Sequence, residues 1–115
     1  MNDFELQREW QALVSKLEDR FGHGLDLDAV LFLVGVQELG QGYRSFKKQE
    51  KTDLMHIAIC RILMPYGFYE YQGMDDDGWP HYLAIAKLPK LGPKQQSLLM
   101  KEALLEYFEN AELVN

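Results

Sequence analysis

Cysteine is nearly absent from this chain, which contains Cys60 and no second cysteine. A lone cysteine excludes a disulfide within the chain and is typical of proteins in a reducing cytosol. Long apolar runs are also missing: the longest, AVLFLVGV, covers residues 29–36, whereas a membrane-spanning helix needs roughly 20 apolar residues. The first ten residues are charged and amphipathic, unlike a secretory signal. We therefore expect a soluble, cytoplasmic protein without a membrane segment.

Positive charge is scarce. The chain has 12 Lys and Arg against 18 Asp and Glu, and residues 65–86 contain four acidic residues and no Lys or Arg. Such a chain repels phosphate backbones, which disfavours nucleic-acid binding. The exception is a basic cluster, Arg44, Lys47, Lys48 and Lys51. The helix expected beyond it is apolar around most of its circumference, so it offers no face for reading bases.

Familiar catalytic and metal-binding motifs are missing as well. The glycines at 35, 40 and 42 fit neither form of phosphate-binding loop, and the chain has no G-x-S-x-G motif. A structural zinc site usually takes four ligands in close Cys and His pairs, but this chain has one cysteine and three scattered histidines. These absences favour a protein that is not an enzyme and that holds no metal or cofactor.

What is present is enough apolar material for a core. Hydrophobic residues make up 47% of 115 residues, a length typical of one domain, residues 1–115. A helix over about 3–21 is predicted by apolar residues spaced three and four apart, namely Phe4, Leu6, Trp10, Leu13, Val14, Leu17 and Phe21. A second helix, about 27–40, is apolar on every side and is expected at the centre of the fold.

Two further helices are expected. The third, about 46–64, begins after Ser45 and is closed by Pro65 and Gly67. The last, about 93–109, has Pro93 at its first position, which suits a helix start. Its core face is predicted to carry Leu99, Met100, Ala103, Leu104, Tyr107 and Phe108, with Leu98 and Leu105 pointing elsewhere.

Between these helices lies YEYQGMDDDGWPHY, residues 69–82, at the centre of a β-hairpin expected over about 68–86. The aspartates do not form an EF-hand loop, because counting from Asp75 puts Trp79 at position five and Pro80 at the position of the required glycine. We therefore interpret the Asp75–Asp77 tip as a turn, with a weak cation or partner contact as the alternative. Pro80 has no N–H for a β-ladder, which places it at an edge or at the first position of its strand.

Together these elements predict an α+β domain: three helices, a β-hairpin, then a C-terminal helix. One group of residues in it resembles a site. His56 and Cys60 lie four apart on one helix face, and His81 or His23 could join them. The simpler interpretation is a histidine at the edge of the core and a buried thiol. A nucleophilic Cys60 is disfavoured, because it lies late in its helix, near the negative end of the helix dipole.

Two functional hypotheses remain. The last helix is apolar on more than one side and the hairpin is aromatic on both faces, which favours a non-enzymatic interaction module, either a homodimer or the binder of another protein. The alternative is a small ligand- or metal-binding protein, or an enzyme, that uses His56, Cys60 and His81. Trp79 and Tyr82 of the hairpin are further candidate binding residues under either hypothesis.

The run LFLVGVQELGQGYRSFKKQEKTDLMHIAICRILMPYGFYEYQGMDDDGWPHY resembles a family of small uncharacterised proteins from Bacteroidota, and the resemblance covers about Leu31 to Phe108. It implies a folded, cytoplasmic product. No activity is attached to that family, so the resemblance assigns a role to no residue.

Overall fold

The computed structural model describes residues 2–110 of the chain. Its elements, in order, are α1 (Asp3–Phe21), α2 (Leu27–Leu39), α3 (Lys48–Leu63), a 3₁₀ turn (Met64–Tyr66), β1 (Tyr69–Met74), β2 (Pro80–Ala84) and α4 (Pro93–Asn110). The two strands pair antiparallel as a two-stranded sheet. The predicted α+β class, with three helices, a hairpin and a closing helix, is confirmed.

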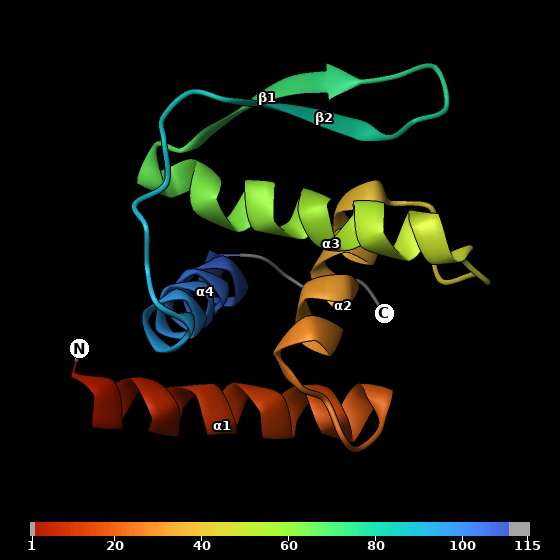
Figure 1. Cartoon of the computed structure of the whole chain (residues 1–115). Coiled ribbons are helices and arrows are strands. Elements are labelled where there is room, and N and C mark those ends of the chain that lie inside the picture. Colours follow the sequence, from red (N-terminus) through yellow and green to blue (C-terminus); the bar gives the residue numbers. More distant parts are fainter. Residues whose placement is uncertain (1, 111–115) are drawn as a thin grey trace.

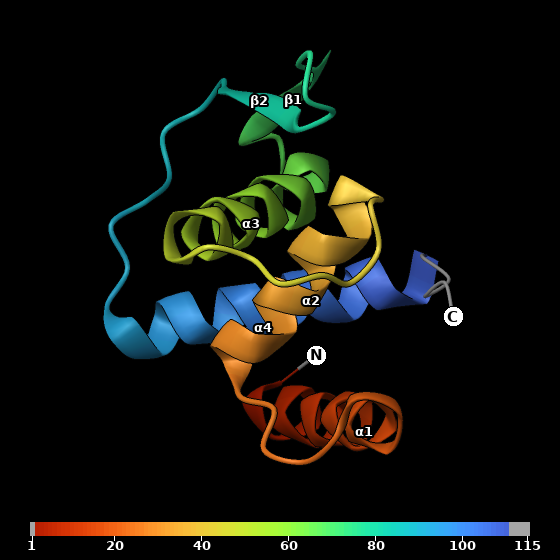
Figure 2. The same cartoon turned by 90° about the vertical axis from the view of Figure 1, so that its right-hand side faces the viewer.

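The elements form layers (Figure 1). Helix α4 lies between α1 and α3, and the hairpin covers the opposite side of α3. Helix α2 crosses α3 and links the layer of α1 to it, as the view turned by 90° also shows (Figure 2). None of the helices within residues 2–110 is long and apolar enough to cross a membrane.

Helix α1 begins at a cap that the sequence provides, since the Asn2 side chain accepts a 2.8 Å hydrogen bond from the Glu5 backbone N–H. Its buried stripe is Leu6, Trp10, Val14 and Leu17. Phe4 was expected in this stripe, but its side chain is 74% exposed. The reason is its spacing: two residues before Leu6 is about 200° around a helix, which is the opposite face.

Helix α2 is buried around most of its circumference, as predicted, and crosses α3 at Gly35. A Cβ atom at position 35 would lie 2.2 Å from the backbone carbonyl oxygen of Leu54. The two helix backbones therefore meet with no side chain between them at this point.

The start of α3 differs from the prediction. The helix begins at Lys48 rather than near residue 46, and the Lys47 backbone N–H donates to the Glu50 carboxylate at 2.9 Å. Phe46 is not helical because its side chain is buried against α2, with its ring edge-on to Phe32 at 5.9 Å between centroids. Packing of this aromatic residue outweighs the helix-start signal of Ser45.

Helix α4 buries more of its surface than expected. Leu98, predicted to point away from the core, is 8% exposed. Because α4 is packed between two layers, both of its apolar sides have partners in the same chain. Several of the exposed large apolar residues instead lie on or beside the hairpin, namely Tyr71, Met74, Leu83 and Ile85.

A polar network ties α2, α3 and α4 together beside this core. The Tyr107 hydroxyl donates to Glu38 Oε2 at 2.6 Å, and Arg61 Nε lies 3.4 Å from Glu38 Oε1. The Arg61 guanidinium also lies over the Tyr107 ring, 5.3 Å from its centroid. Burial, and then the hydrogen bond to Glu38, raise the pKa of Tyr107 well above its ordinary value. The hydroxyl is therefore a donor at every physiological pH.

Replacing Tyr107 with Phe is expected to lower the free energy of unfolding by about 1.5–3 kcal/mol, because it removes a hydrogen bond to a charged partner. Urea denaturation measures the change. Tyr43→Phe is the matched control, since the Tyr43 side chain is mostly exposed, and it should change stability by less than about 0.5 kcal/mol. Equal effects of the two variants would contradict a structural role for the Tyr107 hydroxyl.

Candidate functional site

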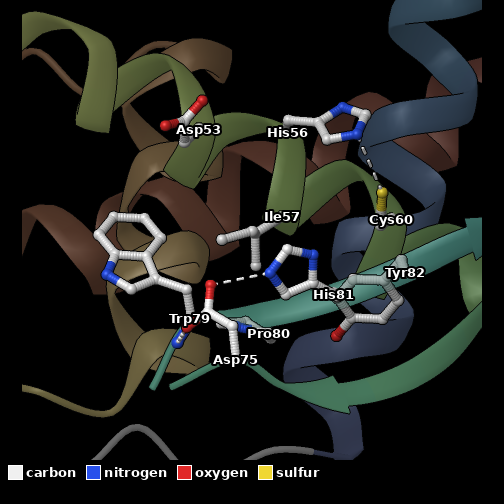
Figure 3. A pocket seen from close by; sticks show the side chains of 9 residues that line it. All are labelled: Asp53, His56, Ile57, Cys60, Asp75, Trp79, Pro80, His81 and Tyr82. Carbon is white, nitrogen blue, oxygen red and sulfur yellow. Dashed lines mark hydrogen bonds and ion pairs between the residues drawn. The ribbon is translucent and has the colours of Figure 1, made fainter. Parts of the chain in front are cut away.

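A pocket of about 380 Å³ opens between α3 and the hairpin (Figure 3). Its lining comes from two segments that the fold brings together, the middle of α3 and the hairpin from its turn into β2. The nine lining residues are Asp53, His56, Ile57, Cys60, Asp75, Trp79, Pro80, His81 and Tyr82.

Simple spacing explains the α3 wall. Positions 53, 56, 57 and 60 follow one another at intervals of three, one and three, which keeps all four side chains on one helix face. The candidate residues predicted from the sequence, His56, Cys60, Trp79, His81 and Tyr82, all line this pocket. His23, the alternative third ligand, does not line it. Asp53 and Asp75 also belong to the lining. Asp75 was expected at the tip of the hairpin, as a turn residue or a weak cation or partner contact, whereas Asp53 was not among the candidate residues.

The pocket has an apolar floor and a polar rim. Ile57, Cys60 and Pro80 are buried and form the floor. Trp79 and Tyr82 are half-buried, and the exposed rim consists of two carboxylates and two imidazoles, from Asp53, Asp75, His56 and His81. This division favours a ligand with an apolar body and at least one polar group.

The acidic tip is a turn, and Asp75 holds it. One oxygen of its carboxylate, Oδ1, accepts hydrogen bonds from the backbone N–H groups of Asp77 at 2.9 Å and Trp79 at 3.0 Å. Gly78 completes the turn with φ of 81°, a conformation that favours glycine. The turn sets the direction of Trp79 at the pocket wall. Pro80 follows as the first residue of β2, one of the two positions predicted for it.

The second oxygen of Asp75 positions His81. Asp75 Oδ2 lies 2.8 Å from His81 Nε2 (Figure 3), and this hydrogen bond is the largest cause of the lowered pKa of Asp75. Since a carboxylate only accepts, the neutral His81 ring carries its proton on Nε2 and leaves Nδ1 as an acceptor. The His81 side chain is 61% exposed, so solvent weakens this pair and it contributes little stability.

On the helix side, Cys60 Sγ lies 3.6 Å from His56 Nε2. The Cys60 side chain is only 1% exposed, and burial raises the pKa of its thiol to about 11. The thiol is therefore protonated at neutral pH and lacks the thiolate that a cysteine nucleophile requires. Cys60 contributes to the floor of the pocket as a small, weakly polar group.

The thiol of Cys60 is expected to react with a disulfide reagent at pH 8 at least about 10-fold more slowly in the native protein than in urea, because burial raises its pKa from 9.0 to about 11 and limits access to the sulfur. The same shift makes stability depend on pH. The contribution of the neutral thiol is complete below about pH 9 and is lost as pH rises to about 11. Similar reaction rates in the native and the unfolded protein would show that the thiol is not buried and that its pKa is not raised.

Within residues 2–110, no group of three or more His, Cys, Asp or Glu side chains is placed to hold a metal ion. The arrangement instead offers hydrogen-bonding groups around an apolar floor. Burial raises the pKa of Tyr82 to about 12, so its hydroxyl can donate at neutral pH. Asp75 fixes the His81 ring through Nε2, so Nδ1 is the ring nitrogen left for a ligand.

Comparisons with models of protein families, with curated proteins and with solved structures found no match to this chain. The resemblance to small Bacteroidota proteins therefore stays a prediction, and the evidence on function is the geometry of the pocket.

Proposed function

We propose that this protein binds a small organic molecule in the pocket between α3 and the hairpin. The observation that supports this is the convergence of His56 and His81, 25 positions apart in the chain, on one hollow with aromatic walls. Its volume of about 380 Å³ falls within the range of small-molecule sites, about 300–1,000 Å³. Since the Cys60 thiol is protonated, we propose binding rather than thiol catalysis.

A fragment screen followed by ¹⁵N–¹H correlation spectra tests this function. Binding fragments should shift amide signals of the lining residues, such as Ile57, Cys60 and Tyr82, and leave α1 unchanged. His56→Ala and His81→Ala should weaken binding, whereas His23→Ala is the matched control because His23 is exposed and does not line the pocket. The proposal would be contradicted if no fragment shifts an amide signal of the pocket. It would also be contradicted if the fragments bind with unchanged affinity to both His56→Ala and His81→Ala.

Self-association through the hairpin is a second candidate, and a separate observation favours it. Within the described residues the sheet has two strands, so each strand has an unpaired outer edge, and Leu83 and Ile85 are exposed beside it. Such edges pair readily with another strand, and a symmetric pair of identical chains is the commonest assembly. The partner that we propose is a second copy of this chain. A cytoplasmic location, proposed from the single cysteine, fits either function.

Light scattering over a concentration series tests self-association. A dimer is expected at high micromolar concentration, and Leu83→Asp should convert it to a monomer by placing like charges at the interface. Phe4→Asp is the control, because Phe4 is also apolar and exposed but lies on α1. A strict monomer at high micromolar concentration would remove this candidate without affecting the pocket.

A further inference from the structure

We propose that the ligand of this pocket is a small organic cation, an ammonium group attached to an aromatic or branched apolar body. This inference rests on the proposed function and adds the chemical class of the ligand. Three features of the lining support it: its charge, a carboxylate oxygen without a partner among residues 2–110, and the arrangement of aromatic walls over an apolar floor.

The lining carries negative charge without compensation from Lys or Arg. Asp53 and Asp75 give it a formal charge of −2 with both histidines counted as neutral, and none of the nine residues is a Lys or Arg. The hairpin extends this field, since residues 65–86 contain four acidic residues and no Lys or Arg. Hollows lined by charge of one sign concentrate ligands of the opposite sign.

The two carboxylates are not equally available. Asp75 uses both of its oxygens, since Oδ1 accepts from two backbone N–H groups and Oδ2 contacts His81. Asp53 accepts one hydrogen bond from the described residues, from Gln49 Nε2 to Oδ1 at 3.0 Å. Its Oδ2 atom is therefore free to accept from a ligand. Asp53 is exposed at the rim, so an ammonium group can reach it without being fully dehydrated.

The remaining surfaces suit the rest of such a molecule. Trp79 and Tyr82 present aromatic rings at the walls, and a cation near an aromatic face is attracted by the ring quadrupole. Below them, Ile57, Cys60 and Pro80 form a buried floor that would remove an apolar body from water. An amine on a ring or a branched chain satisfies the rim and the floor together.

Two other ligand classes are less well matched. An anion would need net positive charge at the rim, but the carboxylates of Asp53 and Asp75 would offset both imidazoles even if these were protonated, and Asp75 lies 2.8 Å from His81. A metal ion would need at least three side-chain ligands, and the described residues do not bring three together. The basic cluster near the start of α3 does not contribute to the lining, and its Arg44 is paired with Glu50 at 3.4 Å.

Three probes with the same phenyl ring and different head groups test the charge preference: 2-phenylethylammonium, 2-phenylethanol and 3-phenylpropionate. Each is titrated at pH 8 and low salt while ¹⁵N–¹H spectra report the lining residues. The ammonium compound should bind about 5- to 30-fold more tightly than the alcohol, from one exposed ion pair and one cation–aromatic contact. The carboxylate should bind more weakly than the alcohol.

Asp53→Asn should remove most of the difference in affinity between the ammonium compound and the alcohol, because it removes the charge that distinguishes them. Asp19→Asn is the matched control, because it makes the same charge change at an exposed position of α1. Equal or tighter binding of the alcohol or the carboxylate at the pocket would overturn the cation proposal while supporting small-molecule binding. If no probe shifts the pocket signals, the cation proposal fails, and the broader fragment screen alone decides the proposed function.

Discussion

Replacing Gly35 with alanine is expected to lower the free energy of unfolding by about 3 kcal/mol or more, at or beyond the upper end for overpacked cores. An alanine within a helix ordinarily stabilises by about 0.5–1 kcal/mol relative to glycine, so the sign of the effect is diagnostic. The new Cβ atom would lie 2.2 Å from the Leu54 carbonyl oxygen and 2.7 Å from its carbonyl carbon. These are backbone atoms, so α2 and α3 must separate to accept it.

Urea denaturation of Gly35→Ala and of a control, Gly92→Ala, measures this effect. A Cβ atom at Gly92 meets nothing within 4 Å, so the control should change stability by less than about 1 kcal/mol. Adding Leu54→Ala to Gly35→Ala should not restore stability, because shortening that side chain leaves the backbone oxygen in place. A stabilised Gly35→Ala protein would show that the helices do not meet at this residue.

Trp10→Ala is expected to cost about 3–5 kcal/mol, the range for removing a large aromatic side chain from a core. Trp10 is 4% exposed on the buried face of α1, and Lys101 of α4 lies 5.7 Å from its ring centroid. Phe4→Ala in the same helix is the matched control. Phe4 is 74% exposed with Arg8 over its ring at 5.9 Å, so its loss should cost only about 0.5 kcal/mol.

Thermal and urea unfolding followed by far-ultraviolet circular dichroism compare the two variants. A large difference between them would show that α1 is held by its Trp10 face. Similar small losses would mean that α1 does not pack on α4, and similar large losses would mean that the Phe4 face is also covered.

Local patterns were sufficient to predict the elements of this fold. The α1 stripe, the capping residue Asn2 and the glycine and aspartate turn of the hairpin are each determined by near neighbours in the chain. The predictions from sequence are wrong where a residue distant in the chain determines whether a side chain is buried. Phe46 stays out of α3 because α2 buries its ring, and Leu98 is buried because α4 has layers on both sides. Neither partner lies close enough in sequence to leave a periodic signal.

In the candidate site, too, local spacing predicts part of the arrangement and contacts between distant segments determine the rest. The spacing of His56 and Cys60 predicted that they share one helix face, and the sequence pattern placed His81 and Tyr82 in the hairpin. That these residues meet in one pocket depends on how the hairpin folds back over α3, which no local pattern encodes. The pairing of Asp75 with His81 depends likewise on the detailed form of the turn. Gly35 shows the same limit of local patterns. A glycine in an apolar helix permits a close crossing of two helices, but the sequence does not indicate that Leu54 is the residue it meets.

The pocket has one wall from a helix of the core and the other from a ribbon of only two strands, whose tip is held to the segment after α2 by a 3.2 Å hydrogen bond from Gln41 Nε2 to the Asp77 carbonyl. Two-stranded ribbons are marginal in water on their own. A ligand that contacts both α3 and the hairpin would stabilise the hairpin against α3. Backbone amides of β1 and β2 would then exchange with deuterated water more slowly, while those of α1, on the far side of the molecule, would keep their rates.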